Sequence, residues 1–147
     1  MSRGLLPPLV LAVALVLGAC SGEDSSLVPS PGPARIDVDT PTLREAKAEA
    51  GIEECRPGRG EPVDGGLPAL ALPCFGGGQD VELSGLRGPL VLNAWFATCG
   101  PCKRELPVLQ DFYEQHGDRV DVLGVDFSDS IPEGAMQLLV DSGVTYP

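Results

Sequence analysis

The stretch AWFATCGPCKRELP, residues 94–107, places two cysteines, Cys99 and Cys102, three positions apart. An apolar run ends in the first half of the stretch, and a helical pattern of apolar residues begins in the second half. The cysteines therefore stand where a strand gives way to a helix. Such a close pair serves as a redox couple, as half of a metal site, or as a structural bridge. The rest of the sequence decides between these uses.

The patterns around the pair predict the order β-α-β-α. The run PLVLNAW at 89–95 is short and nearly continuous in its apolar character, which is typical of a strand covered on both faces. A helix is predicted over 102–115, a second buried strand over 120–127, and a second helix over 132–141. This order favours an α/β fold with a parallel sheet and right-handed crossovers.

The preceding residues predict an N-terminal extension over 37–66. It contains a short amphipathic helix at 41–50, which begins with a proline at the first helical position, where a missing N–H costs little. Two short strands are predicted at 69–74 and 81–83. The glycine-rich segment between them predicts a hairpin-like turn.

The charge of the chain excludes one class of partner. Ten Lys and Arg residues stand against 21 Asp and Glu residues, which gives a formal net charge of −11. There is no basic stripe, and no motif resembles a nucleic-acid binding motif, so no nucleic-acid partner is expected. The acidic residues are spread along the chain and are interpreted as solubilising surface.

The first twenty residues resemble a bacterial lipoprotein leader. One basic residue, Arg3, precedes an uncharged apolar run that is short for a membrane span and ends in LGAC at 17–20. That ending is similar to the lipobox, in which the cysteine, here Cys20, is acylated and becomes the mature N-terminus. Residues 1–19 are therefore predicted to be a lipoprotein signal peptide, with an ordinary cleaved signal as the alternative.

A flexible linker is predicted over 20–36. The segment is small, polar and rich in proline, so it cannot bury enough apolar surface to offset the entropy of ordering. Acylated Cys20 followed by a spacer predicts attachment to a lipid membrane. The expected location is the cell membrane, with the folded part lipid-anchored on the extracytoplasmic face.

The other four cysteines are expected to pair, because this compartment is oxidising. Four cysteines allow three connectivities, and the most economical one joins Cys55 to Cys74 and Cys99 to Cys102. The first bridge closes a loop with few core residues, so it is predicted to be a structural, inert disulfide that contributes about 2–4 kcal/mol. A zinc site of four thiolates is the alternative. It is disfavoured because Cys55 and Cys74 stand too far apart to form a close ligand pair, and neither a metal nor a cofactor is predicted.

The position of Cys99 predicts its chemistry. A sulfur just before a helix faces unsatisfied N–H groups and the positive end of the helix dipole. The pKa of such a thiol falls from about 8.5 into the range of about 3.5–7.5. Cys99 is therefore predicted to be the exposed nucleophile, and Cys102, in the first turn, to be the covered thiol that resolves the mixed disulfide.

The residues around the pair resemble thioredoxin-like proteins, and most closely the TlpA/ResA branch of membrane-tethered thiol-disulfide oxidoreductases. The matching residues are Trp95, Cys99-Gly100-Pro101-Cys102, Lys103 and Pro107. Residues 83–93 resemble the segment that leads into the active-site strand of that branch. The likeness covers 67–147 and implies a thioredoxin-like domain there, with Trp95, Gly100 and Pro101 supporting the active site.

Two positions depart from the family pattern. Asn93 stands where cytosolic thioredoxins carry a buried aspartate, so the resolving step needs another base or water. Asparagine is familiar in the TlpA/ResA branch. Thr98 stands where many relatives have a second tryptophan, so part of the hydrophobic contact surface for substrates is expected to be missing.

The last residues, GVTYP at 143–147, are similar to the approach to the family's cis-proline. The resemblance implies that Pro147 supports the active site, and that the Tyr146–Pro147 bond is cis in the complete protein. The family fold continues with a β-hairpin and a helix. The thioredoxin-like domain is therefore expected to be incomplete, and the chain to be a fragment.

Three other residues carry side chains that could take part in chemistry. His116, the only histidine, is expected to cap the end of the first helix of the β-α-β-α unit rather than to take part in catalysis. Asp126 and Asp129 follow the second strand and are interpreted as loop carboxylates. A proton relay through Asp126 is the alternative.

The leading functional hypothesis is an extracytoplasmic, lipid-anchored thiol-disulfide oxidoreductase that exchanges disulfides through its CGPC pair. The Gly-Pro dipeptide favours a reductant, of the type used in cytochrome c maturation or disulfide repair. The expected partners are protein thiols and disulfides of the cell envelope, and a membrane reductant protein. The alternatives are a ligand-binding or structural envelope lipoprotein with an inert disulfide, and a thiol peroxidase.

Overall fold

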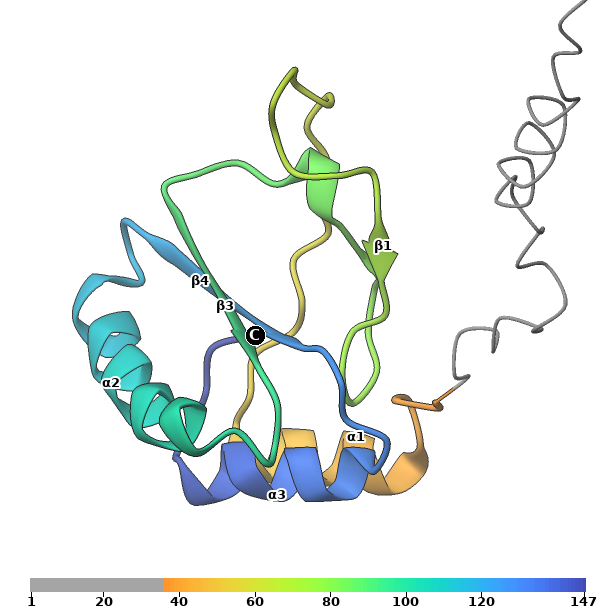
Figure 1. The fold of residues 1–147 in the computed structure, drawn as a ribbon, viewed down its shortest axis with the longest axis vertical. Helices are drawn as coiled ribbons and strands as arrows, with labels where there is room; N and C mark the ends of the chain where they lie inside the picture. The colour runs from red at the N-terminus through yellow and green to blue at the C-terminus, as the bar shows by residue number, and fades with distance from the viewer. Residues whose placement is uncertain (1–35) are drawn as a thin grey trace, which may run out of the picture. The chain divides into compact units, whose positions relative to one another are not determined.

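The computed structural model describes residues 36–147 (Figure 1). The predicted signal peptide, the acylated Cys20 and nearly all of the predicted linker lie outside the described residues. Within 36–147, no helix combines the length and the apolar character that crossing a membrane requires.

Helix α1, Pro41–Ala50, has the predicted bounds. Thr40 precedes it, and its Oγ1 accepts a hydrogen bond from the Leu43 N–H at 3.3 Å, which satisfies one of the free donors of the first turn. The helix ends at Gly51, whose φ of 70° lies in the left-handed region that favours glycine. Leu43 is buried and fixes the inward side of α1.

The central unit has the predicted β-α-β-α order. Strands β3, Leu90–Trp95, and β4, Asp121–Asp126, pair in parallel. Helix α2, Gly100–His116, connects them and begins two residues earlier than predicted. Helix α3, Pro132–Asp141, follows β4 and packs against α1 (Figure 1). The predicted α/β class is therefore correct.

The predicted hairpin is present, but its strands are shorter than expected. β1, Ala71–Leu72, pairs antiparallel with β2, Val81–Glu82. A 3-10 turn, Leu83–Gly85, replaces the end of the predicted second strand. The cause is local: the Glu82 carboxylate accepts hydrogen bonds from the N–H and the hydroxyl of Ser84, and so caps the turn.

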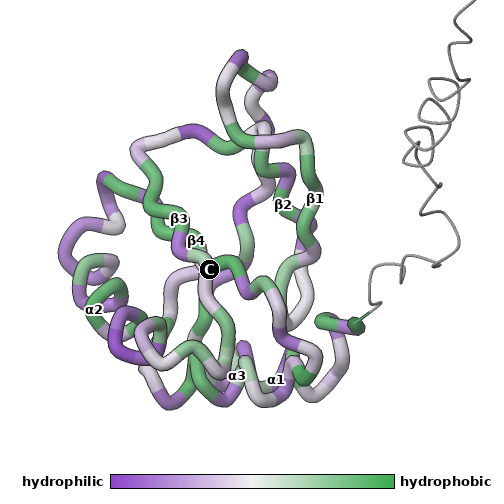
Figure 2. The backbone as a smooth tube through the Cα atoms, in the orientation of Figure 1, coloured by the Kyte–Doolittle hydropathy of each residue, from purple (hydrophilic) through white to green (hydrophobic). Residues whose placement is uncertain are grey.

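Two hydrophobic clusters lie against the sheet. The first cluster joins Trp95 of β3 to α2 and α3, with Leu106 and Leu139 at its centre. The second joins Leu123 of β4 to the hairpin. Figure 2 shows apolar residues along both paired strands, which is why helices and hairpin pack there.

The expectation that β3 is covered on both faces is wrong for its second half. Asn93 and Trp95 are buried, whereas Leu92 is 40% exposed and Ala94 is exposed. The hairpin covers Leu90 on that side and does not extend over the next two outward residues. β3 therefore has one buried face and one partly open face.

Candidate active site

The two cysteines of the CGPC motif lie at the carboxyl end of β3. Cys99 is the N-cap of α2, and its Sγ accepts a hydrogen bond from the Cys102 N–H at 3.1 Å. Pro101 occupies the first turn, where a missing N–H breaks no helical hydrogen bond. The sulfur of Cys99 therefore lies where free amide donors and the positive end of the helix dipole favour a negative charge.

The structure joins Cys99 and Cys102 in a disulfide. The two sulfurs have different surroundings: Cys99 is partly exposed, whereas Cys102 is only 8% exposed and packs in the first cluster. Thr98, directly before Cys99, is exposed. A substrate that approaches this edge therefore meets Cys99 before Cys102.

Trp95 and Asn93 form the buried floor on the β3 side. Trp95 is 2% exposed and belongs to the same cluster as Cys102, so it packs beside the motif. Asn93 is also buried, and its Nδ2 has no hydrogen-bond partner within 36–147. The hydroxyl of buried Tyr146 has no partner of full hydrogen-bond geometry among these residues either; burial raises the pKa of this phenol, and the neighbouring Asn93 side chain opposes that rise.

The Tyr146–Pro147 bond is not cis in this chain, and the cis bond expected in the complete protein stays a prediction. The cis peptide bond among the described residues is Gly88–Pro89. The Gly124 N–H donates to the Pro147 carbonyl at 2.8 Å, which places Pro147 beside the middle of β4. This hydrogen bond holds the end of the chain along β4.

Asp129 lies closer to the motif than its interpretation as a loop carboxylate implied. Its Oδ2 accepts a hydrogen bond from the Ala97 N–H at 2.6 Å, two residues before Cys99. Asp126 ends β4 opposite Trp95 in the parallel register. The loops that follow the two strands are therefore tied together at the edge that carries the disulfide.

Asp126 is half-buried beside this contact, and its Oδ1 has no hydrogen-bond partner within 36–147. Burial, and then the neighbouring carboxylate of Asp129, raise the pKa of Asp126 to about 7. The pair can therefore hold one proton near neutral pH. The signal in the sequence was two aspartates three positions apart, directly after a strand at the functional edge of the sheet.

His116 lies at the end of α2, as expected from its position. Its ring packs on Phe112 with centroids 4.9 Å apart, and its Nδ1 lies 3.1 Å from Nη2 of Arg119. These contacts are far along the helix from its first turn. They give His116 a local role at the helix end.

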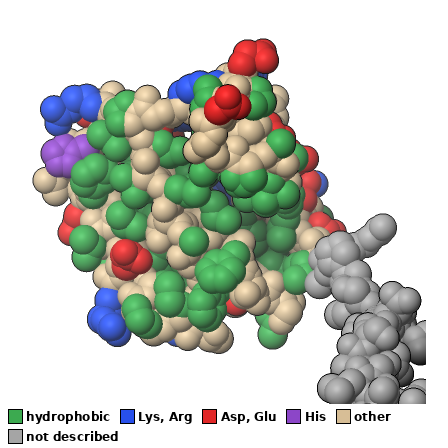
Figure 3. Space-filling model, turned by 45° about the horizontal axis from the view of Figure 1, so that its top comes forward, with side chains coloured by type: hydrophobic (Ala, Val, Ile, Leu, Met, Phe, Trp, Pro, Cys, Tyr) green, Lys and Arg blue, Asp and Glu red, His purple; other side chains and the backbone are tan. Residues whose placement is uncertain are grey.

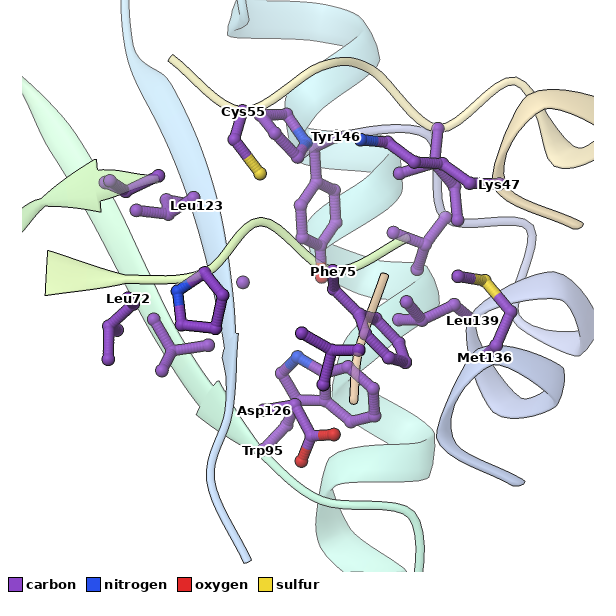
Figure 4. Close-up of a pocket in the computed structure, with 18 of the residues that line it drawn as sticks. Lys47, Cys55, Leu72, Phe75, Trp95, Leu123, Asp126, Met136, Leu139 and Tyr146 are labelled. Atoms are coloured by element: carbon purple, nitrogen blue, oxygen red, sulfur yellow. The ribbon is translucent and has the colours of Figure 1, made fainter. Parts of the chain in front are cut away.

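A cavity of about 250 Å³ opens beside β4 (Figure 4). Its walls come from α1, the hairpin, β4, α3 and the last residues of the chain. Trp95 and Asp126 line it, so the cavity adjoins the residues next to the CGPC motif. Figure 3 shows hydrophobic side chains spread over one face, with most charged side chains at its margin.

Cys55 and Cys74 form a second disulfide, which joins the segment after α1 to the hairpin. Cys74 is buried, and Cys55 is partly exposed and lines the cavity. No group of three or more His, Cys, Asp or Glu side chains within 36–147 is arranged to hold a metal ion.

Comparison with known proteins identifies the class of this fold and site. Residues 63–147 match the AhpC/TSA family, and the chain belongs to that family. The predicted likeness to thioredoxin-like proteins is confirmed by named relatives. No solved structure matches the chain significantly.

Three relatives illustrate the similarity. The chain is 34% identical over 65 residues to sporulation thiol-disulfide oxidoreductase A of Bacillus subtilis, which covers 44% of the chain and 39% of that protein. It is 34% identical over 73 residues to the thiol-disulfide oxidoreductase ResA of Halalkalibacterium halodurans, a match that covers 48% of the chain and 40% of that protein. It is 39% identical over 49 residues to a thioredoxin of Alicyclobacillus acidocaldarius, a match that covers 33% of the chain and 46% of that protein. The matches thus span less than half of each of these relatives.

Proposed function

We propose that this chain carries the redox site of a thiol-disulfide oxidoreductase that exchanges disulfides with proteins through Cys99 and Cys102. The position of Cys99 carries the proposal. Its sulfur caps α2, accepts the Cys102 N–H, remains partly exposed, and is bonded to a buried partner sulfur. The names of the relatives support the same reaction.

In the reducing direction, the Cys99 thiolate attacks one sulfur of a substrate disulfide, and the other substrate sulfur leaves as a thiolate. Cys102 loses its proton and attacks Cys99 Sγ, which releases the second substrate thiolate. The Cys99–Cys102 disulfide forms, and two electrons have passed to the substrate. Helix α2 favours the first step, because its free amide groups stabilise the attacking thiolate.

The lipid anchor belongs to the proposal. Acylation of Cys20 places the folded part on the extracytoplasmic face, where protein thiols and disulfides of the cell envelope are the substrates. A membrane reductant protein supplies electrons, and the Gly100-Pro101 pair favours the reducing direction of cytochrome c maturation or disulfide repair. The leader and the CGPC motif support this part of the proposal.

The activity is tested with a non-acylated protein, Cys20→Ser, in the reduction of insulin by dithiothreitol. We expect acceleration by this protein, none by its Cys99→Ser derivative, and a trapped mixed disulfide on Cys99 in its Cys102→Ser derivative. No acceleration by a folded protein whose Cys99 and Cys102 thiols are free would refute the proposal. Consumption of peroxide at enzymatic rates by Cys99 would replace it with a thiol peroxidase.

The direction is tested by titration of Cys99 and Cys102 in redox buffers, read by alkylation. A reductant is expected to have a potential nearer to the about −270 mV of thioredoxin than to the about −120 mV of the strong oxidant DsbA. The anchor is tested separately: Cys20→Ala should move the protein out of the membrane fraction. A wild-type protein that takes up no acyl label would exclude lipidation.

A further inference from the structure

A buried lysine lies against the Cys55–Cys74 disulfide. Lys47 of α1 is 3% exposed, and its Nζ donates to Cys74 Sγ at 3.3 Å. The same Nζ donates to the Gly77 carbonyl at 2.8 Å and to Glu54 Oε2 at 3.1 Å. An ammonium group has three donors, so each has an acceptor here, and one acceptor is a disulfide sulfur.

The turn after Cys74 is built around this ammonium. Gly76, Gly77 and Gly78 have φ values of 71°, 85° and 121°, which favour glycine. A Cβ at Gly76 would lie 3.0 Å from the Lys47 side chain, and a Cβ at Gly78 would lie 3.2 Å from Cys74 Sγ. The three glycines therefore let the backbone close over both the ammonium and the sulfur.

The other sulfur of the disulfide is reachable. Cys55 is partly exposed and lines the cavity beside β4, together with Leu72, Leu123 and Tyr146. Figure 4 shows its sulfur directed into the space between Leu123 and Tyr146. The bond thus has one sulfur on an open cavity and one sulfur enclosed beside a positive charge.

We propose that Cys55–Cys74 is a second thiol-exchange site, at which a small thiol enters the cavity and attacks Cys55 while Lys47 stabilises Cys74 as the leaving thiolate. This goes beyond the proposed function, which uses only Cys99 and Cys102. It also departs from the expectation that the Cys55–Cys74 bridge is inert. Exchange is faster when the leaving sulfur is stabilised as a thiolate. A nearby ammonium group stabilises that negative charge.

Reduction of the disulfide consumes two molecules of the same small thiol. A first thiolate bonds to Cys55 Sγ, the Cys55–Cys74 bond breaks, and its electron pair goes to Cys74. A second thiolate then attacks the small-molecule sulfur of the mixed disulfide and releases Cys55 as a thiolate. Two thiols become one small disulfide, and Cys55 and Cys74 take up the two electrons and, as thiols, two protons.

The walls of the cavity select the class of thiol. Most are apolar side chains, and the charged groups that line it are Lys47, Glu53, Asp126 and Asp129. Lys47 is paired with Glu54 and Glu53 with Arg56, so the unpaired charge around the cavity is that of the Asp126–Asp129 pair, which stays negative even when it holds one proton. A neutral thiol is therefore expected to react faster than an anionic one. The probes are 2-mercaptoethanol and 3-mercaptopropionate, compared at equal thiolate concentration.

The test uses the chain in which Cys20, Cys99 and Cys102 are replaced by serine, so that one disulfide remains. Lys47→Met is compared with Lys103→Met, which removes the same charge from an exposed position of α2. Reduction by 2-mercaptoethanol should slow about tenfold in Lys47→Met and stay unchanged in Lys103→Met. In the chain with Lys47 intact, 3-mercaptopropionate should react at least about threefold more slowly than 2-mercaptoethanol.

Equal rates of reduction in a folded Lys47→Met variant and in Lys103→Met would overturn the proposal, and so would equal rates for the two probes. If Lys47→Met fails to fold, a second measurement tests the proposal. The chain with Lys47 intact is reduced, and its thiolate absorbance is followed as the pH is raised. One of its two thiols should ionise clearly below the about 8.5 of a free cysteine, and ionisation of both at or above that value would overturn the proposal. Cys99 and Cys102 are absent throughout, so failure here leaves the proposed oxidoreductase function untouched.

Discussion

At the scale of single residues, the Asp126–Asp129 pair shows how a loop gains a titrating group near neutral pH. Asp129 is held by the Ala97 N–H, so its carboxylate stays close to Asp126. Asp126 is half-buried and has one oxygen without a partner among the described residues. Its proton is therefore bound more tightly in the folded chain than in the unfolded one.

Asp126→Asn should make the chain more stable at high pH. The pKa of Asp126 rises from 3.8 to about 7 on folding, so the folded state binds the proton more strongly. Stability therefore falls as pH rises from about 4 to about 7, and the loss persists above that range. After allowance for solvent screening of a half-exposed group, Asn should gain about 1 kcal/mol near pH 8 and almost nothing near pH 4.

Urea unfolding at the two pH values measures this difference. Asp64→Asn removes the same charge from an exposed position of the segment before the hairpin and is the matched control. If the free energies of unfolding of both variants change in parallel with pH, the raised pKa of Asp126 is not the cause. The proton relay through Asp126 is tested by the pH profile of the rate at which Cys102 resolves the mixed disulfide. If the pair accepts the Cys102 proton, Asp126→Asn should flatten this profile near neutral pH.

Ser128→Gly should stabilise the loop after β4. Ser128 has a φ of 141°, a region that side chains with a Cβ rarely adopt. Release of this strain, less the entropy that glycine adds to the unfolded chain, predicts a gain of about 1 kcal/mol in the free energy of unfolding. Chemical denaturation of Ser128→Gly beside Ser130→Gly measures it, and a loss at position 128 would contradict it.

The candidate redox residues depend on local pattern, so the sequence alone predicts them. Cys99 and Cys102 follow from a strand-helix junction, which is encoded within a dozen residues. The hydrogen bond from Ala97 to Asp129 joins residues 32 apart, and Lys47 reaches Cys74 across 27. No periodicity connects such positions, so only the folded arrangement reveals them.

At the scale of elements, α1 matters because it carries Lys47 to the second disulfide. Its start depends on the Thr40 hydroxyl, which accepts the Leu43 N–H. Without this cap, the first turn of the helix keeps one more amide group unpaired. The helix that carries Lys47 is therefore capped by a residue seven positions before it.

Thr40→Ala should lower the free energy of unfolding by about 1 kcal/mol, because a capping hydrogen bond is lost. Thr42→Ala is the control within the helix, where the side chain is exposed and alanine has the higher helix propensity. The control should be neutral or slightly stabilising in urea unfolding. Equal losses at both positions would show that the cap contributes nothing specific.

The helices were predicted more closely than the strands. α1 and α3 have start and stop signals in their own sequences, and their predicted bounds are correct. The hairpin strands have two residues each, and the second one ends early because Glu82 turns its carboxylate back onto Ser84. Such competition between a side chain and a strand ladder is invisible to a count of apolar residues.

At the scale of the whole molecule, the Cys55–Cys74 bridge fastens the segment after α1 to the hairpin. Its sulfurs join two segments 19 residues apart in sequence. Cys55 packs against the second hydrophobic cluster, which covers one face of the sheet. Opening the bridge therefore removes the covalent link between the segment after α1 and the hairpin.

The double substitution Cys55→Ala and Cys74→Ala should cost about 3 kcal/mol in the free energy of unfolding, the loop entropy expected for a bridge of this span. Urea unfolding of the chain with Cys99 and Cys102 replaced by serine isolates the effect. The Cys99–Cys102 bridge closes almost no loop, so replacing these two cysteines alone should cost much less in the free energy of unfolding. A loss below about 1 kcal/mol for the double substitution would show that the loop stays ordered without its bridge.

The N-cap of α2 has a consequence for the proposed exchange reaction. The amide of Cys102 binds the sulfur of Cys99 rather than a separate capping side chain. Since a thiolate is at least as good an acceptor as a bridged sulfur, the helix keeps its cap when the bond opens. In the proposed exchange, the first turn of α2 can therefore stay folded in both the oxidised and the reduced form.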